Sequence, residues 1–455
     1  MNQKKLSMGA KLKFGIGDFG CSVITALIQF YMLFYYTDVV GINPGLAGTA
    51  MLVGKLTWDM VNDVLFGYLE DKTRSRWGRR RPYLIFGAVP LMLSFWLLLS
   101  VPEGLADVPA FFAIIGTFIL FDTFHTLVAT AYAAMSAELT ADYDERTSLT
   151  TCRMIFNIVG YIFGAGVSSM LAGIIATQTG MSDREAWSIL GLIFGALGAI
   201  TVLIPGLFLK EDTSIVPEPT KFPPVRAIFS TLKNKPFVSY LVISMIMSTA
   251  FTMVTTMLPY YLIYQLDMGD AQILVMLLML GTLALCLVPC AKVSGKIGKA
   301  KTYALGITIA SLGLIVAFFL SGAGAAIFFL AAIVGLGFSS QWVCPHSMMP
   351  DVIEYDELAT GERREGIYFG MNATAGKITG ALGSAICGWG LELGGYVEGV
   401  AQTEKALTAI RGMFAFLPAV LLLCCVPLLI RYPITRESHA QVVRQLEERR
   451  KEQSK

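Results

Sequence analysis

Three ionisable residues stand one helical turn apart in a stretch of sequence that is otherwise strongly apolar. Lys55, Asp59 and Asp63 are spaced by four residues, and Asn62 adjoins the last of them. On a helix this spacing places the three side chains on one face. Two carboxylates one turn apart repel each other unless a cation, a proton or a lysine neutralises them, and carboxylate, amide and hydroxyl oxygens suit a hard cation. The pattern therefore predicts a cation site, and an ion-pair network that only holds helices together is the alternative.

Lys377 is a further ionisable residue inside an apolar run, in the segment GKITG at 376-380. If the run crosses a bilayer, a charged side chain there costs about 2.5 to 3.5 kcal/mol on insertion scales and needs a partner. With Lys55 paired elsewhere, Lys377 leaves the two aspartates with one uncompensated negative charge, which one monovalent cation would neutralise. We therefore predict Lys377 and Lys55 as coupling residues that let the protein reorient once the cation is bound. A lysine that only extends toward the membrane interface is the alternative.

The elements that must position these residues are membrane-spanning helices. Of the 455 residues, 55 % are hydrophobic and 15 % are charged, whereas soluble domains carry about 25 % charged residues. The mean hydropathy of +0.62 agrees, and the composition excludes a soluble enzyme with a single anchor. Apolar windows of about 20 residues identify membrane spans. They predict an all-α integral membrane protein with twelve transmembrane helices at 14-37, 45-69, 82-101, 109-134, 153-176, 187-209, 237-262, 272-292, 302-321, 324-349, 367-392 and 409-430.

Lysine and arginine are unevenly distributed over the connectors between these spans. Most of the 35 basic residues lie in the N-terminal segment, in alternate connectors and in the C-terminal tail, whereas the opposite connectors hold only Arg184 and Lys405. Basic connectors stay on the cytoplasmic side of a membrane. We therefore expect a multi-pass protein of the cell inner membrane with both termini and the loop 210-236 in the cytoplasm. The net charge of +2 gives no reason to expect a nucleic acid partner.

The chain divides into two related halves. The segment MSAE at 135-138 followed by YDE at 143-145 resembles MPDV at 349-352 followed by YDE at 355-357, as duplication would leave it. Two six-helix bundles related by an axis along the membrane normal form the major-facilitator arrangement, with substrate bound between them. We predict an N-terminal bundle, a cytoplasmic middle loop, a C-terminal bundle and a charged cytoplasmic tail at 1-209, 210-236, 237-430 and 431-455.

The connector after the second span resembles the major-facilitator signature. It runs from Gly67 through Asp71 to the arginines at 79-81, and an aspartate at a helix end beside arginines can favour one conformation. Acidic loops at 138-146 and 351-365 indicate a similar cytoplasmic latch in each half, and a plain basic anchor is the alternative. The predicted latch residues are Asp71, Arg79, Glu138, Arg146, Asp351 and Arg363.

Four segments carry a resemblance to a known family: YYTDVVG at 35-41, WDMVND at 58-63, RSRWG at 74-78 and DVIEY at 351-355. They resemble the glycoside-pentoside-hexuronide cation symporters of the major facilitator superfamily, and the resemblance runs nearly end to end. It implies a twelve-span carrier that moves sugars with Na+, Li+ or H+ by alternating access. The cation site that it implies, with Na+ at the two aspartates, consists of Asp59, Asn62, Asp63 and Thr126.

The same resemblance matches Lys377 to the lysine of the family's eleventh span. Asn62 and Thr126 would have little purpose in a purely protonic site, so we expect Na+ as the coupling ion, with H+ as the alternative. No other cofactor is expected. Three histidines far apart in sequence, at 125, 346 and 439, do not form the convergent set that an enzyme needs, so we expect a transporter and not an enzyme.

The sugar site departs from the pattern of the resemblance. Ser22 and Ala129 stand where the family's melibiose carrier has sugar-binding aspartates, and Ala133 replaces its stacking tryptophan. Arg153 and Trp342 are the matching residues that remain. A missing acceptor leaves polar groups of the ligand unpaired at about 1 to 3 kcal/mol each, so we expect a substrate other than melibiose. The alternatives are a more lipophilic solute such as a lysophospholipid, or a channel-like facilitator.

Polar and aromatic residues of several spans are candidates for the substrate site. Aromatic faces and amides suit the apolar face and the hydroxyls of a sugar, and for each of them helix packing is the alternative. Asp18 lies close to a helix end and could serve a gate instead. We expect a monomer that binds one small-molecule substrate, a sugar or glycoside, together with a monovalent cation in a lipid bilayer. The predicted substrate-binding residues are Asp18, Ser22, Gln29, Tyr31, Arg153, Trp342, Tyr368 and Asn372.

Overall fold

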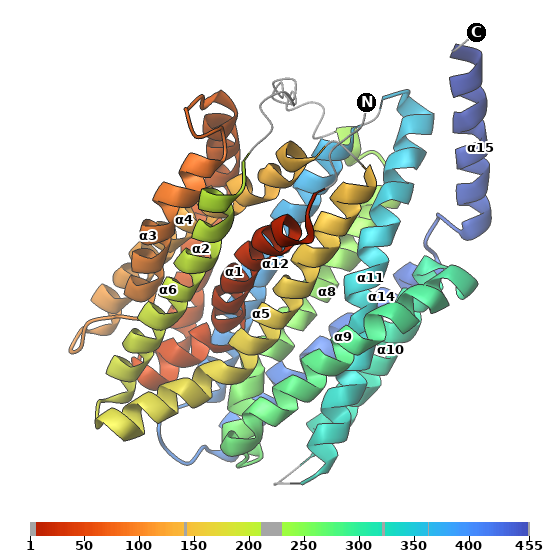
Figure 1. Ribbon diagram of the computed structural model, residues 1–455. Coiled ribbons are helices and arrows are strands. Elements are labelled where there is room, and N and C mark those ends of the chain that lie inside the picture. Colours follow the sequence, from red (N-terminus) through yellow and green to blue (C-terminus); the bar gives the residue numbers. More distant parts are fainter. Residues whose placement is uncertain (1–5, 141–142, 211–229, 321–323, 363, 454–455) are drawn as a thin grey trace. The chain divides into compact units, whose positions relative to one another are not determined.

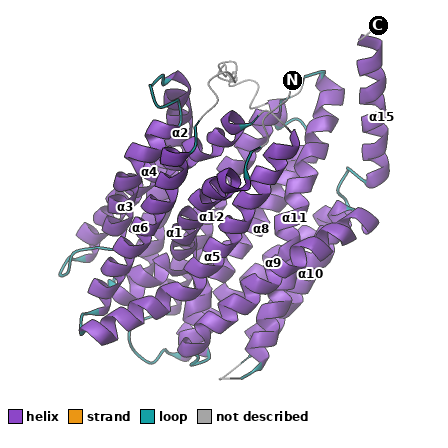
Figure 2. Ribbon diagram, viewed as in Figure 1, coloured by secondary structure: helices purple, strands orange, loops and turns teal. Residues whose placement is uncertain are grey.

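The computed structural model is helical over most of its length (Figure 1). It describes residues 6–140, 143–210, 230–320, 324–362 and 364–453. Within these ranges the only extended pairing is an isolated bridge between Ser75 and Gly78, and Figure 2 shows helices joined by loops. The predicted all-α fold class is therefore confirmed. Most of the middle loop and Arg363 lie outside the described residues, as do the side chains of Asp59, Asp71, Glu138 and Arg146.

Each predicted span coincides with a helix or with a short series of helical segments. The first six are α1 (Met8–Phe34, continued by the π-helical turn Tyr35–Val39), α2 (Pro44–Lys72), α3 (Arg81–Leu98), α4 (Asp107–Leu139), α5 (Tyr143–Thr179) and α6 (Asp183–Phe208). The next five are α8 (Lys235–Tyr260, continued by Tyr261–Gln265), α9 (Gln272–Ile297, preceded by the 3-10 turn Gly269–Ala271), α10 (Lys299–Phe318), α11 (Ala326–Thr360) and α12 (Glu365–Gly394). The last is formed by α13 (Glu404–Arg411), the π-helical turn Gly412–Phe416 and α14 (Leu417–Ile430), and the tail forms α15 (Arg436–Gln453).

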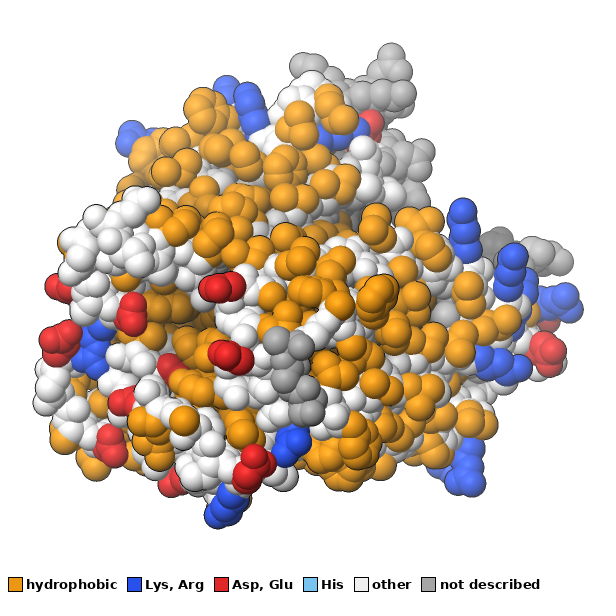
Figure 3. Space-filling model, turned by 90° about the horizontal axis from the view of Figure 1, so that it is seen from below, with side chains coloured by type: hydrophobic (Ala, Val, Ile, Leu, Met, Phe, Trp, Pro, Cys, Tyr) orange, Lys and Arg blue, Asp and Glu red, His pale blue; other side chains and the backbone are white. Residues whose placement is uncertain are grey.

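Ten helical segments of the described chain are long and apolar enough to cross a membrane. The other two predicted spans coincide with α2 and α12, which carry the ionisable residues Lys55, Asp63 and Lys377. Their 29 and 30 residues, at a rise of about 1.5 Å each, exceed the hydrocarbon thickness of about 30 Å. Leu285 and Phe329 are 79 % and 73 % exposed, as side chains that face lipid would be. Figure 3 shows hydrophobic side chains over much of the visible face, with acidic and basic side chains among them.

Two compact units divide the chain. Unit 1 comprises Met1–Thr220 and Ser384–Ala406, and unit 2 comprises Lys221–Gly383 and Leu407–Lys455. In this division the last part of α12, within the predicted C-terminal bundle, groups with unit 1. Small residues permit this packing: a Cβ on Gly388 would lie 2.4 Å from the carbonyl oxygen of Pro44. The indole of Trp389 also donates to Thr49 Oγ1 at 2.9 Å.

In unit 1, α1 packs closely against α5 because two glycines of α5 face the backbone of α1. A Cβ on Gly160 would lie 2.4 Å from the carbonyl oxygen of Phe19, and one on Gly164 would lie 2.4 Å from that of Val23. Two glycines four residues apart are typical of membrane helices in close contact. This contact fixes the polar face of α1 against the first half of α5.

In unit 2, α11 packs against α9 and α10 through small residues. A Cβ on Gly335 of α11 would lie 2.1 Å from the carbonyl oxygen of Met279 in α9. The predicted charged tail is a helix, α15, that is tied to α11: His439 Nε2 lies 2.7 Å from Glu354 Oε2. Arg449 also donates to the carbonyl oxygen of Leu358 at 2.7 Å.

Candidate substrate and cation sites

A cluster of polar side chains lies where α1 meets α5 in unit 1. Arg153 Nε donates to Asp18 Oδ2 at 2.8 Å, so the guanidinium and the carboxylate form an ion pair. Asn157 Nδ2 donates to Ser22 Oγ at 2.7 Å and lies 3.4 Å from Asp18 Oδ2. The side chain of Asp18 is 9 % exposed and that of Arg153 is 26 % exposed. The structure therefore brings together three predicted substrate residues, Asp18, Ser22 and Arg153, inside a helix bundle.

Tyr132 of α4 completes this cluster with an aromatic face. The guanidinium carbon of Arg153 lies 5.1 Å from the centroid of the Tyr132 ring, which is within the range of a cation–π contact. Tyr132 is itself fixed by Phe14, with 4.7 Å between the stacked ring centroids and a hydrogen bond from the tyrosine hydroxyl to the Phe14 carbonyl oxygen. The guanidinium is thus held between a carboxylate and an aromatic ring.

The chemistry of the cluster suits a ligand that both donates and accepts hydrogen bonds. The carboxylate of Asp18 only accepts, Arg153 only donates, and the amide of Asn157 and the hydroxyl of Ser22 do both. Sequence reasoning missed Asn157 and Tyr132. Asn157 follows Arg153 by four residues, so both lie on one helical face, and that spacing is the signal that could have identified it. Tyr132 lies on a different helix, and no local pattern marks it.

Gln29 and Tyr31, also predicted for the substrate site, lie further along α1. Tyr31 is fully buried, and its hydroxyl donates to the carbonyl oxygen of Ala165 at 2.8 Å. Its ring packs against Trp187 of α6 with 5.8 Å between centroids. The hydroxyl of Tyr31 is thus engaged within the helix packing of unit 1, and the ligand-binding roles of Gln29 and Tyr31 stay predictions.

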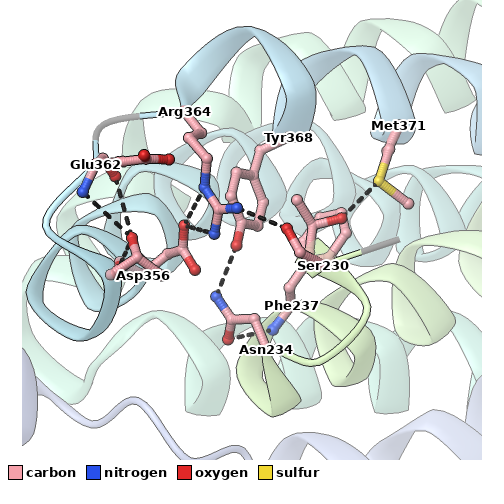
Figure 4. Close-up of polar contacts among 10 residues, drawn as sticks. Ser230, Asn234, Phe237, Asp356, Glu362, Arg364, Tyr368 and Met371 are labelled. Atoms are coloured by element: carbon pink, nitrogen blue, oxygen red, sulfur yellow. Dashed lines mark hydrogen bonds and ion pairs between the residues drawn. The ribbon is translucent and has the colours of Figure 1, made fainter. Parts of the chain in front are cut away.

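The remaining predicted substrate residues, Trp342, Tyr368 and Asn372, belong to unit 2. Tyr368 is fully buried, packs edge-on against Phe237 at 4.6 Å between centroids, and accepts a hydrogen bond from Asn234 Nδ2 at 3.1 Å (Figure 4). Asn372 lines a cavity of this unit. These three residues and the cluster around Asp18 are therefore distributed over both units.

Two predicted cation ligands, Asn62 and Thr126, come from the packed helices α2 and α4. Both are buried, with exposures of 0 % and 3 %. Asn62 Nδ2 donates to Asp122 Oδ2 at 2.5 Å, while Asn62 Oδ1 is buried without a hydrogen-bond partner among the described residues. A buried acceptor left unpaired costs about 1 to 3 kcal/mol, and a cation would satisfy it. Asp63 is half-buried on α2, and Asp122 is an acidic neighbour that sequence reasoning did not assign to the site.

The two predicted coupling lysines belong to different units. Lys55 lies on α2, with its Nζ 5.9 Å from the centroid of the Phe118 ring of α4, in the range of a cation–π contact. Lys377 is half-buried on α12 and belongs to unit 2. The coupling roles of both lysines stay predictions.

A buried ion pair lies beside the predicted latch of unit 1. Arg80 Nη1 donates to Glu70 Oε2 at 2.8 Å, and the two side chains are 7 % and 1 % exposed. Glu70 Oε1 also accepts a hydrogen bond from Thr130 of α4 at 2.6 Å. Glu70 and Arg80 are the immediate neighbours of the predicted residues Asp71 and Arg79, and sequence reasoning did not assign either of them. The pair ties the end of α2 to the start of α3 and to α4.

In unit 2 the predicted latch residue Asp351 has two basic partners. Lys299 Nζ lies 2.7 Å from each oxygen of the Asp351 carboxylate. His439 Nε2 lies 3.3 Å from Asp351 Oδ1 and 2.7 Å from Glu354 Oε2. Asp351 therefore links the start of α10 and the tail helix α15 to α11.

Arg364, next to the predicted Arg363, forms a second ion pair at this end of unit 2 (Figure 4). Its Nη2 lies 2.6 Å from Asp356 Oδ2, and its Nη1 donates to Ser230 Oγ at 2.6 Å. Partial burial lowers the pKa of Arg364, but the hydrogen bond and charge of Asp356 outweigh this effect and raise the pKa above its usual value. The guanidinium stays charged and joins α11 and α12 to the segment before α8.

Comparison with known proteins agrees with this architecture. A family model described as MFS/sugar transport protein matches residues 13–436. The isoprimeverose transporter of Lactiplantibacillus pentosus is 27 % identical, over 90 % of this chain and 85 % of that protein. YagG of Escherichia coli, named for glycoside/cation symport, is 27 % identical over 97 % of this chain and 95 % of that protein.

A solved structure shares the fold. A mutant of the nucleoside transporter NupG superposes with a TM-score of 0.70 at 13 % identity, over 93 % of this chain and 100 % of that one. At that identity the likeness shows the fold alone. The family match, by contrast, spans nearly the whole chain, and it confirms both the expected transporter class and the resemblance to the glycoside-pentoside-hexuronide cation symporters. The chain therefore belongs to the MFS/sugar transport protein family, and it is a membrane transporter and not an enzyme.

Proposed function

We propose that the protein is a cation-coupled symporter that carries a sugar or glycoside across the cell inner membrane. The cluster of Asp18, Ser22, Arg153 and Asn157 within the bundle of unit 1 carries this proposal. Relatives named for isoprimeverose transport and for glycoside/cation symport support the substrate class and the coupling.

The cluster binds a sugar by exchanging its own hydrogen bonds for bonds to the ligand. The Asp18 carboxylate accepts from two sugar hydroxyls, while the guanidinium of Arg153 donates to hydroxyl or ring oxygens through the nitrogens that do not face Asp18. The ring of Tyr132 lies beside the guanidinium and offers an apolar face to the carbon-bound hydrogens of a sugar. Because the carboxylate and guanidinium are paired before the ligand arrives, two charges are tolerated inside the bundle.

The coupling cation in this proposal is Na+, bound by Asp59, Asn62, Asp63 and Thr126. The unpartnered Oδ1 of Asn62 among the described residues supports a cation with oxygen ligands, because a proton needs no amide carbonyl. Na+ brings one positive charge to the two aspartates and Lys377 supplies the second, while Lys55 is paired elsewhere. With the cation bound, the net charge of the site is zero, which lowers the free-energy cost of its passage through a low-dielectric environment during reorientation. H+ coupling through the carboxylates is the second candidate.

The arrangement in the membrane follows from the basic connectors. We place both termini and the middle loop on the cytoplasmic side, where lysine and arginine are retained. The Glu70–Arg80 pair and the Asp351–Lys299 pair would then lie at the cytoplasmic ends of their helices and stabilise the conformation in which those ends are packed.

Uptake into proteoliposomes tests this proposal. The purified protein is reconstituted, and uptake of a panel of radiolabelled pentoses, hexoses, hexuronates and disaccharides is measured with an inward Na+ gradient, an inward H+ gradient or no gradient. We expect saturable accumulation of at least one sugar that depends on the Na+ gradient. Sugar uptake that does not depend on any cation gradient would rule out symport. Conductance that does not saturate with substrate concentration would favour a channel.

A further inference from the structure

Unit 2 contains a cavity of about 200 Å³ between α8, α10, α11 and α12. Its lining includes hydroxyl, amide and imidazole groups from all four helices. The polar residues that matter here are Tyr240, Ser244, Tyr303, Gln341, His346 and Asn372. Among them, Asn372 is a predicted substrate-binding residue, and the cavity that joins it to Tyr303 is a finding of the structure.

Tyr303 and Gln341 are among the polar side chains around this cavity that have a buried atom with unused hydrogen-bonding capacity. Tyr303 is 1 % exposed, and its hydroxyl has no hydrogen-bond partner in the described part of the chain. Gln341 Oε1 likewise lacks a partner among the described groups. Burying such groups without a partner costs about 1 to 3 kcal/mol each, so two of them around one cavity indicate a ligand that supplies the missing bonds.

The lining also defines what kind of ligand would fit. The residues that the structure describes around the cavity include no aspartate, glutamate, lysine or arginine, and Met245, Met349 and Phe369 provide apolar walls. A charged ligand would lose its hydration without gaining a counter-charge. A volume of about 200 Å³ is also below the roughly 300 to 1,000 Å³ of pockets for drug-sized molecules. The cavity thus suits a single uncharged ring that carries hydroxyls and has an apolar face.

We propose that this cavity binds a neutral monosaccharide ring, with Tyr303 and Gln341 as the residues that recognise its hydroxyls. The inference deepens the proposed sugar transport and rests on it for the substrate class, but it concerns binding and requires no cation gradient. The two proposed polar sites also differ in the charge of their side chains. The cluster around Asp18 and Arg153 offers a carboxylate and a guanidinium to a ligand, whereas the residues described around the cavity of unit 2 include no acidic side chain, lysine or arginine.

Equilibrium binding of D-glucose, D-galactose, D-mannose and D-xylose to the purified, detergent-solubilised protein tests the proposal, with D-glucuronate as the charged comparison. We expect at least one neutral sugar to bind, and Tyr303→Phe and Gln341→Leu each to raise its Kd about 10-fold, which is about 1.4 kcal/mol. The melting temperature of both variants should stay the same or rise, because each change removes a buried group that has no partner.

Matched control variants are available in unit 2. The hydroxyl of Tyr432 and Oε1 of Gln265 are also buried without a partner among the described residues, but neither residue lines the cavity. Tyr432→Phe and Gln265→Leu therefore make the same chemical changes elsewhere and should leave the Kd unchanged. An equal loss of affinity in the control variants, or no loss in Tyr303→Phe and Gln341→Leu, would show that the cavity holds only water and would overturn the proposal.

A third variant tests the cavity by its volume. Ala375 of α12 lines the cavity and is 7 % exposed, so Ala375→Leu should fill part of the space and abolish binding of the neutral sugar. The assignment of a neutral-sugar site to the cavity would be contradicted if none of the four neutral sugars bound. It would also be contradicted if D-glucuronate bound with equal affinity and the same variants reduced that affinity. If neutral-sugar binding follows these variants but reconstituted protein shows no cation-driven uptake, the cavity stands and the proposed symport fails.

Discussion

The two units differ in where they place their charges. In unit 1 the ion pair Asp18–Arg153 lies in the substrate cluster inside the helix packing, with the Asp18 side chain 9 % exposed, whereas Glu70–Arg80 joins helix ends. In unit 2 the described ion pairs lie toward helix ends; the side chains of Asp351 and Lys299 are 11 % and 36 % exposed, and those of Asp356 and Arg364 are 6 % and 13 % exposed. The residues described around the cavity of unit 2 include no carboxylate, ammonium or guanidinium group.

This difference follows from the cost of burial. A charge inside a helix bundle has to be paired before any ligand arrives, since breaking a buried ion pair costs about 3 to 5 kcal/mol. A neutral hydroxyl or amide can remain unpaired for about 1 to 3 kcal/mol. The proposed site of unit 1 would therefore bind a ligand by exchanging hydrogen-bond partners, whereas the proposed site of unit 2 would bind one by satisfying groups that had no partner. Changes to the charges of unit 1 should consequently have the largest effects.

The strongest test of this contrast is Arg153→Leu. It leaves the Asp18 carboxylate buried without its cation, and we expect a loss of about 3 kcal/mol in stability, at the low end of the range for buried pairs because the arginine is partly exposed. Uptake should fall at least 100-fold. Thermal unfolding and proteoliposome uptake measure the two effects.

The double variant Asp18→Asn/Arg153→Leu is the control for this prediction. It removes both charges, so most of the lost stability should return while uptake remains abolished. Recovery of uptake in the double variant would show that the pair only holds the helices together and does not bind substrate.

Close packing of α1 on α5 should matter next, because it sets the geometry of the charged cluster. In Gly160→Ala the added Cβ would lie 2.4 Å from the carbonyl oxygen of Phe19, so the helices must separate. We expect uptake to fall about 10-fold and stability to fall by about 1 to 3 kcal/mol. Gly173→Ala on the same helix is the matched control, since a Cβ there meets nothing within 4 Å. Equal losses in the two variants would mean that the contact with α1 is not responsible, because the change to alanine raises helix propensity at both positions.

The fold could be predicted from the sequence because helices that cross a lipid bilayer have long apolar sequences. Apolar windows identified the helices of the predicted spans but not the charged tail helix α15, and α4, α5 and α11 extend beyond their predicted spans because helical structure continues through polar sequence. The boundary of the second half was less predictable. The end of α12 joins unit 1 through Gly388, and a contact between residues that distant in sequence leaves no local pattern.

The sites were predictable only where a spacing or a family motif marked them. Asp18, Ser22 and Arg153 were identified in this way, but Tyr132 was not, because it joins the cluster from another helix. The buried pair of unit 1 involves Glu70 and Arg80, each one position from a predicted latch residue. Successive residues of a helix point about 100° apart, so only the position of the neighbouring helix decides which one is buried. Tyr303 and Gln341 lie on different helices, and no sequence pattern indicates that they line the same cavity.

A smaller effect is expected from an uncharged ligand group in unit 1. Thr126→Val removes only the buried hydroxyl of a proposed cation ligand. We expect the Na+ concentration for half-maximal uptake to rise about 10-fold, which is about 1.4 kcal/mol, with little change in melting temperature. Thr117→Val, in which the lost hydroxyl is bonded to carbonyl oxygens of its own helix, is the control. Sugar uptake that is driven by a pH gradient and is unchanged in Thr126→Val would instead indicate that H+ is the coupling ion.

The smallest effect should come from the partly exposed contacts that α15 makes with α11 in unit 2. His439 of α15 lies 2.7 Å from Glu354 and 3.3 Å from Asp351, but part-exposed pairs contribute only about 0 to 1 kcal/mol and are weakened by salt. His439→Ala should therefore lower stability by less than about 1 kcal/mol, and the difference from wild type should shrink in 1 M NaCl, where the Debye length is about 3 Å. Glu70→Gln, which leaves Arg80 without its counter-charge inside unit 1, should cost several times more and be insensitive to salt. Salt-dependent melting curves of the two variants separate these cases, and a large, salt-independent loss in His439→Ala would show that the tail helix is held as firmly as the interior of unit 1.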